Sequence, residues 1–174
     1  MLLLGHIGIT VGIVYAIERG FARDTWPKLD YRLVIIGAIL PDLIDKPLSL
    51  TGLIGGRAIA HTLLFAIIIS AIVSIVVLKS RKSNLLYFIP LGIAFHLILD
   101  NMWGAPDILL WPAYGFSFPI SEVSVETLLQ MLLSNPYLYG GEITGAIILA
   151  IPILKNKLYT GKAINQFFRK GVLS

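Results

Sequence analysis

The sequence contains no cysteine among its 174 residues, and only 14% of its residues carry a formal charge. The lack of cysteine excludes a small domain held together by disulfides. Soluble domains have about 25% charged residues, so this chain has too few to cover a globular surface. With 56% hydrophobic residues, the chain is also neither disordered nor a soluble DNA-binding module. What remains is an integral membrane protein, which we expect to form a single domain over residues 1–174.

Five apolar stretches predict an all-α, polytopic bundle of about five transmembrane helices. The clearest, residues 58–78, has no formal charge and matches the roughly 20 residues that cross a bilayer. No basic segment precedes the first stretch, so we expect a retained helix rather than a cleaved signal. Pro41 predicts a kink or an end in the second helix, whereas Asn135 and Pro136 predict the cap and first turn of the fifth. The predicted spans are residues 1–17, 33–50, 58–78, 83–100 and 137–154.

The basic residues are distributed unevenly along this layout. If the spans alternate, residues 18–32, 79–82 and 155–174 lie on one side, with 12 basic and 3 acidic residues. The other side and the spans hold 2 basic and 7 acidic residues. The positive-inside rule then predicts an inner-membrane protein with its N-terminus outside and a basic cytoplasmic tail at 155–174. We interpret the basic residues as topology signals and contacts to membrane lipids, and we expect no nucleic-acid partner.

Residues 101–136 form the longest segment between predicted spans and lie on the outer side. Aromatic residues gather there at a density typical of the membrane–water interface. We therefore predict a re-entrant or interfacial segment, and a buried aromatic plug is an equal alternative. The aromatic residues concerned are Trp103, Trp111, Tyr114, Phe116 and Phe118.

Six ionisable residues lie within or at the ends of the apolar stretches, and they include every histidine of the chain. Such groups cost several kcal/mol in a membrane and usually mark function. At about 1.5 Å of helical rise per residue, all six can lie in the outer half of the bilayer. Mixed histidine and aspartate ligands suit Zn²⁺, and Mn²⁺ or Mg²⁺ are also compatible. The six are His6, Asp42, Asp45, His61, His96 and Asp100.

The sequence spacing within two pairs of these residues supports a metal site. His96 and Asp100 are four residues apart and therefore share one helical face. That spacing suits two ligands of one ion, a ligand with its orienting carboxylate, or a plain hydrogen bond. Asp42 and Asp45, beside Pro41, suit either a divalent cation or a capped helix end.

Arg57 precedes His61 by four residues. The two side chains share a face if the helix already begins at Arg57. A guanidinium there can bind a phosphate or a carboxylate through its fork of donors, or it can mark the membrane boundary.

Five motifs follow one another along the chain: Gly5-His6, residues 37–45, residues 57–62, residues 96–100 and residues 109–112. From Gly5 to about Pro112 they resemble the membrane-bound metal-dependent hydrolase family of YdjM-like, LexA-binding inner-membrane proteins. That family is similar to zinc-dependent phospholipase C and the S1/P1 nucleases. The resemblance implies that the six histidines and aspartates are metal ligands, that Arg57 belongs to the site and that Trp111-Pro112 line its rim. The departures are alanine at positions 58 and 60 with threonine at 62, and a second residue between the aspartates.

These features together predict a metal-dependent hydrolase for a phospholipid-like phosphoester at the outer interface. A bound metal would activate water, Arg57 would neutralise the phosphate, and Asp45 or Glu142 would move the proton. A helix-capping carboxylate is the alternative for Glu142. The alternative functions are a metal-ion or proton transporter and a non-catalytic, metal-stabilised membrane scaffold or adaptor.

Overall fold

The computed structural model describes residues 1–20, 29–52, 54–80, 84–119, 130 and 133–173. Over these residues the chain is helical without any strand, which confirms the all-α prediction. Three short 3₁₀ turns accompany the helices: η1 (Ile59–His61), η2 (Asn84–Tyr87) and η3 (Met102–Gly104). The helices are α1 (Leu3–Gly20), α2 (Tyr31–Ser49), α3 (Leu63–Ser80), α4 (Phe88–Leu99), α5 (Pro106–Leu109), α7 (Pro136–Lys155) and α8 (Gly161–Lys170).

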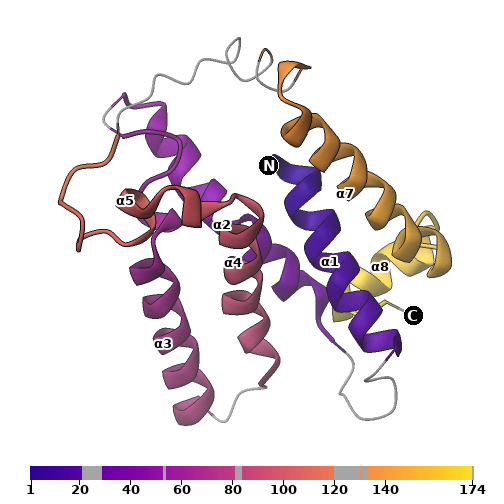
Figure 1. Cartoon of the computed structure of the whole chain (residues 1–174). Coiled ribbons are helices and arrows are strands. Elements are labelled where there is room, and N and C mark those ends of the chain that lie inside the picture. Colours follow the sequence, from indigo (N-terminus) through magenta and orange to yellow (C-terminus); the bar gives the residue numbers. More distant parts are fainter. Residues whose placement is uncertain (21–28, 53, 81–83, 120–129, 131–132, 174) are drawn as a thin grey trace.

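The helices form two sets that meet at α2 (Figure 1). On one side α1 packs along α7, with α8 beside the C-terminal end of α7, and on the other α2 packs along α4, with α3 beyond. One apolar core, around Val11 and Val34, joins α1 to the start of α2, and a second lies around Ile93 and Met102. Residues from both sets can therefore meet where α1, α2 and α4 come together.

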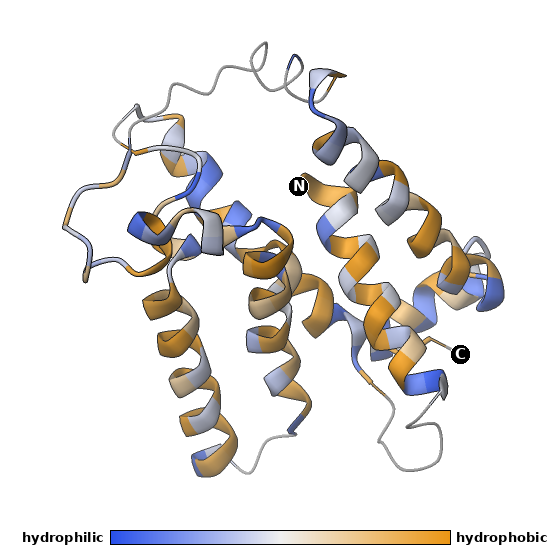
Figure 2. Ribbon diagram, viewed as in Figure 1, coloured by the Kyte–Doolittle hydropathy of each residue, from blue (hydrophilic) through white to orange (hydrophobic). Residues whose placement is uncertain are grey.

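A helix occupies each of the five predicted spans, but only α3 and α7 are long and apolar enough to cross a membrane. Only 6% of α3 is buried, and Figure 2 shows α3 as a largely apolar ribbon at the edge of the molecule. An apolar helix this exposed fits a lipid environment better than a soluble core. Five membrane crossings and the orientation of the chain stay predictions.

Glycine pairs set the distance between the packed helices. A Cβ atom added at Gly8 would overlap the backbone of Gly145, and one added at Gly37 would overlap the backbone of α4 at Ile89. Small residues allow such close approach and are typical of helix contacts in membranes.

Replacement of Gly37 by alanine is expected to lower the free energy of unfolding by about 1–3 kcal/mol, because α2 must move away from α4. Thermal unfolding in detergent measures this change. Gly140→Ala is the matched control, since an added Cβ there meets nothing within 4 Å and alanine favours the helix. Equal unfolding temperatures for the two variants would contradict the close contact of α2 with α4.

One prediction about helix ends is wrong and two agree with the structure. The second helix continues through Pro41 to Ser49, close to the predicted span of residues 33–50, so an end at Pro41 is excluded. The third predicted span is not one helix, because η1 and an extended Thr62 precede α3, so Arg57 and His61 do not share a helical face. Asn135 caps α7 through its side chain, which accepts from the Tyr137 amide, as predicted.

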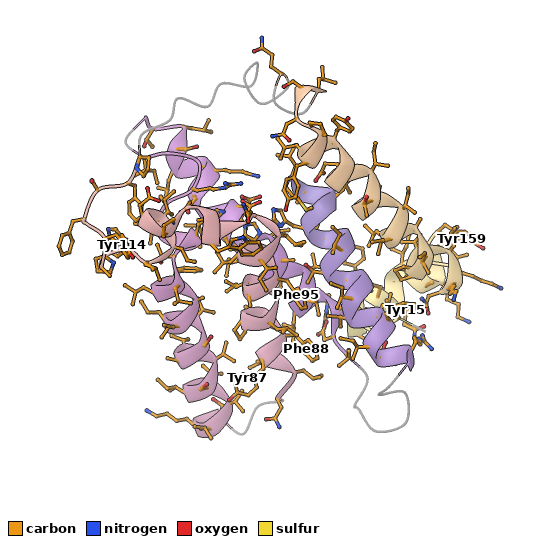
Figure 3. The ribbon with its side chains drawn as sticks, in the orientation of Figure 1. Tyr15, Tyr87, Phe88, Phe95, Tyr114 and Tyr159 are labelled. Atoms are coloured by element: carbon orange, nitrogen blue, oxygen red, sulfur yellow. The ribbon has the colours of Figure 1, made fainter. Side chains whose placement is uncertain are left out.

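The described part of residues 101–136 divides its side chains between core and surface. Met102 and Ile108 are buried against α4, whereas Trp103, Tyr114 and Phe116 are exposed. Figure 3 shows Tyr114 at the edge of the molecule, far from the helix cores. This exposure favours an interfacial segment over an aromatic plug. Residues 120–129, 131 and 132 lie outside the described part.

The start of α2 is joined to the end of α8. The Tyr31 amide donates to the carbonyl of Gly171, at 2.8 Å, next to the N-cap residue Asp30. The hydrogen bonds of the Arg32 guanidinium hold the pKa of the Asp30 carboxyl below its usual range. This contact fixes the end of α2 opposite the one that carries Asp42 and Asp45.

Candidate metal centre

The six predicted residues come from four elements and converge on one place. His6 lies in α1, Asp42 and Asp45 in α2, His61 in η1 and His96 in α4, and Asp100 is the C-cap of α4. Two overlapping groups offer ligand atoms within 4.8 Å of one another, and His96 belongs to both. The first group is His6, His96 and Asp100, and the second is Asp42, His61 and His96. Both groups can hold a metal ion.

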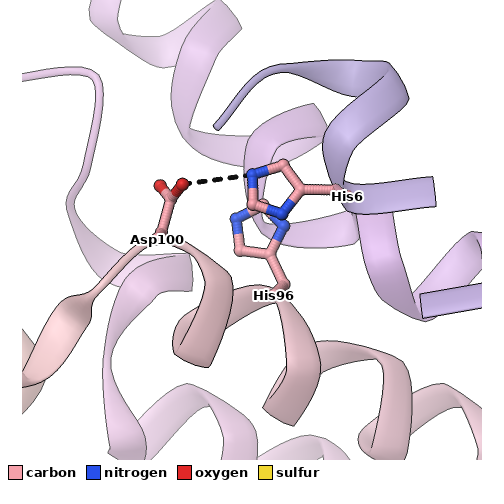
Figure 4. A group of neighbouring side chains, drawn as sticks. All are labelled: His6, His96 and Asp100. Atoms are coloured by element: carbon pink, nitrogen blue, oxygen red, sulfur yellow. Dashed lines mark ion pairs between the residues drawn. The ribbon is translucent and has the colours of Figure 1, made fainter. Parts of the chain in front are cut away.

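The first group leaves one histidine nitrogen without a partner. His6 Nε2 lies 3.1 Å from Asp100 Oδ1, as Figure 4 shows, and the rings of His6 and His96 stack with centroids 3.9 Å apart. The same Nε2 lies 3.2 Å from the Met1 carbonyl, which can only accept, so Nε2 carries the proton. The buried Nδ1 keeps its lone pair and has no partner among the described residues. Such an atom costs free energy, and a cation would satisfy it.

The second group brings two histidine lone pairs together. His96 Nδ1 lies 2.7 Å from the Ala38 carbonyl, and His61 Nδ1 lies 2.7 Å from Asp45 Oδ2. Both partners accept, so both Nδ1 atoms donate and both Nε2 atoms keep their lone pairs. These Nε2 atoms are 3.1 Å apart. Two lone pairs at this distance repel each other unless a proton or a metal ion lies between them.

The distances suit a tetrahedral ion. Bonds of about 2.0–2.1 Å to Zn²⁺ place two ligand atoms about 3.3 Å apart. Asp42 Oδ1 lies 3.6 Å from His61 Nε2 and 3.9 Å from His96 Nε2, which completes a triangle of this size. The residues present therefore fit a divalent metal.

Asp45 lies next to this triangle but belongs to neither group. Its carboxylate is fully buried and accepts from the amides of Ala58 and Ala60, at 2.7 and 3.1 Å, and from His61. With its oxygens bound in this way, Asp45 orients His61 and holds η1 in place. The roles of Asp45 as a metal ligand and a catalytic group stay predictions. The same two amide bonds explain why the chain forms η1 here rather than the start of α3.

Two cationic side chains bind the Oδ2 atoms of Asp42 and Asp100. Arg57 Nε donates to Asp100 Oδ2 at 2.9 Å, and Lys46 Nζ donates to Asp42 Oδ2 at 2.5 Å. Arg57 thus joins the site as predicted, from the bend before η1. Lys46 is a site residue that the sequence reasoning missed, although its spacing of four from Asp42 on one helix was a usable signal.

Glu142, a candidate proton carrier from the sequence, caps a helix in the structure. It extends from α7, and its carboxylate accepts from the amides of Leu2, Leu4 and Gly5 at 2.9 Å each. These are orphan donors at the start of α1, where a negative charge is also favourable. Glu142 belongs to neither metal group and fixes the turn of α1 that carries His6.

Replacement of Glu142 by alanine is expected to cost about 1–3 kcal/mol of stability, because three backbone donors lose their acceptor. Chemical denaturation in detergent gives this value. Glu142→Gln keeps an acceptor oxygen and is expected to lose less than half as much. A Gln variant as unstable as the Ala variant would assign the effect to charge instead of capping.

The predicted rim residues lie in the outer segment. Trp111 stacks on Phe118, with ring centroids 5.3 Å apart, and meets Phe116 edge to face. The turn with Trp111 and Pro112 follows α5, which contacts η1. A position at the rim of the metal centre stays a prediction from the resemblance.

A comparison with known proteins gives one match. The family described as YdjM inner membrane protein matches residues 1–162. The matched range contains all six histidines and aspartates of the centre, together with Lys46, Arg57 and Glu142. No curated protein and no solved structure matches the chain.

Proposed function

The chain belongs to the YdjM inner membrane protein family, and on this premise we propose that it is a membrane-bound metal-dependent hydrolase of phosphoesters. The carrying observation is the pair of Nε2 lone pairs on His61 and His96, 3.1 Å apart with Asp42 beside them. A purely structural cluster would place a donor against one of these nitrogens. Two acceptors held face to face by Asp45 and Ala38 are the arrangement that metal-binding histidines require.

Each residue of the centre has a separate task in this proposal. His61, His96 and Asp42 hold the ion, and His6 and Asp100 provide the adjoining ligands. Zn²⁺ fits the mixed donor set, with Mn²⁺ or Mg²⁺ as alternatives. When bound, such an ion supplies an activated water and polarises a phosphoryl oxygen. Arg57 binds the phosphate charge through its guanidinium, and the burial of the histidines excludes bulk water.

The distribution of basic residues along the chain indicates from which side of the membrane the substrate reaches the centre. With the basic loops in the cytoplasm, the centre lies in the outer half of the membrane. A phospholipid-like phosphoester at the outer interface is therefore the proposed substrate. The exposed aromatic side chains of residues 103–116 suit contact with lipid headgroups at that level.

Metal analysis of the protein purified in detergent tests this function directly. We expect stoichiometric Zn²⁺ or another divalent ion in the wild type and in Lys162→Ala, a control on exposed α8. His61→Ala is expected to lose it. The metal-loaded wild type is then expected to release phosphate or a headgroup from mixed lipids, and chelation is expected to stop the release. A metal-free wild type that cannot be loaded, or a loaded one without turnover, would refute the hydrolase.

A further inference from the structure

Each of the two carboxylates that face the histidines binds a cationic side chain through Oδ2. Asp42 turns Oδ1 toward His61 and His96 and binds Lys46 with Oδ2. Asp100 turns Oδ1 toward His6 and binds Arg57 with Oδ2. Asp42 thus connects a metal group to one cation, whereas Asp100 connects one to two, because its Oδ1 also accepts from the N-terminal ammonium of Met1 at 2.5 Å.

Both cationic side chains belong to one cluster. His61 Nε2 lies 3.6 Å from Asp42 and 3.7 Å from Asp100, so the two carboxylates flank the same imidazole. The carboxylate side chains are 12% and 3% exposed and the histidine is fully buried. The side chains of Lys46 and Arg57 are 41% and 44% exposed. A ligand that approaches the centre therefore meets these two cations first.

Charge balance indicates what such a ligand carries. Without metal, Lys46, Arg57 and the N-terminal ammonium of Met1 more than neutralise Asp42 and Asp100. A divalent ion bound to the Oδ1 atoms of the two carboxylates would share their negative charge. The charges of Lys46 and Arg57 would then no longer be fully compensated. Uncompensated charge is costly in a poorly hydrated site, so a second anion is favoured there. Two cations beside a metal match a group with two negative charges.

The two side chains also differ in what they can donate. Arg57 donates to Asp100 through Nε. Its two terminal nitrogens have no protein acceptor among the described residues, so they can form a two-point contact with phosphate oxygens. Lys46 is a flexible point charge that keeps further N–H donors besides the one on Asp42. The combination provides one rigid and one adjustable contact.

We propose that Lys46 and Arg57 form an anion-binding pair that selects a dianionic phosphomonoester group over a monoanionic phosphodiester. The pair is placed to receive this group directly over the metal centre, so the inference rests on the proposed function and narrows its substrate class. Lys46 is the new member of the site, and its role is to set this specificity.

Calorimetric titration of the Zn²⁺-loaded protein at pH 8 tests the pair with inorganic phosphate and with dimethyl phosphate. We expect the wild type to bind phosphate at least about tenfold more tightly than the diester, as one charge-assisted contact implies. Lys46→Met is expected to lose about tenfold in phosphate affinity and about twofold or less for the diester. Lys46→Arg should restore the phosphate affinity, and Lys162→Met on α8 is the matched control.

A second set of ligands tests whether the phosphomonoester group belongs to a free molecule or to a lipid. Glycerol 3-phosphate represents a free monoester, and phosphatidic acid in mixed micelles represents a lipid-borne one, with phosphatidylglycerol as the diester lipid. Tighter binding of either monoester than of phosphatidylglycerol supports the pair and identifies the source.

A competing explanation makes different predictions. If Lys46 only neutralises Asp42, Lys46→Met will bind Zn²⁺ more tightly and will leave phosphate affinity within twofold of the wild type. That result, or equal affinity of the wild type for phosphate and the diester, overturns the inference while the metal centre stands. Failure of the wild type to bind any metal overturns the proposed function as well.

Discussion

Replacement of His96 by alanine is expected to remove metal binding by the whole centre. His96 belongs to both groups, and its Nδ1 is committed to the Ala38 carbonyl, so a single Nε2 lone pair serves both. The two groups therefore share one ligand that can bind only one ion at a time. We expect the affinity for Zn²⁺ to fall by at least about a hundredfold, as measured by competition with a chelator of known strength.

The matched variant is His6→Ala, which removes a member of the first group alone. It is expected to retain one ion on Asp42, His61 and His96, with a smaller loss of affinity. If His96→Ala instead retains one equivalent of tightly bound metal, the two groups act independently and the shared role of His96 is refuted.

Asp45→Ala is expected to produce the largest loss of stability, about 3–5 kcal/mol in the free energy of unfolding of the metal-free protein. The carboxylate is fully buried, and its removal leaves the amides of Ala58 and Ala60 and the Nδ1 of His61 without an acceptor. Because His61 also loses its orientation, metal affinity should fall by about 10- to 100-fold in any variant that still folds.

The Asp45→Asn variant separates the effect on stability from the effect on metal affinity. The amide keeps one acceptor oxygen for the η1 backbone but presents N–H groups where donors already converge. We expect intermediate stability and a metal affinity close to that of the alanine variant. Denaturant unfolding in detergent and a metal titration measure the two quantities separately. An alanine variant as stable as the wild type would refute the role of Asp45 as an anchor of η1.

The helices could be predicted from the sequence because long apolar runs determine them. The apolar setting of the six histidines and aspartates indicated that they have a function. Their depth along the helices allowed a shared site, and the family resemblance implied it. The different roles of these six residues could not be predicted from the sequence. Spacing alone gave Asp42 and Asp45 the same role, but only Asp45 accepts amide protons from a segment 13–15 residues further on.

Contacts between distant segments explain the other differences. Pro41 removes one hydrogen bond within α2, yet the helix continues because Gly37 packs against α4 and His96 binds the Ala38 carbonyl. Glu142 reaches amides 137–140 residues away, which no local pattern indicates. Lys46 differs in this respect, because its pair with Asp42 follows from helical spacing alone.

The bond between Glu142 and the start of α1 has a consequence for biogenesis. A ribosome makes α1 first and α7 after every residue of both metal groups. Until α7 has been inserted, the first turn of α1 lacks its acceptor, and His6 has no fixed position beside Asp100. The first metal group therefore matures only when nearly the whole chain has been synthesised, whereas the second group needs no residue beyond His96.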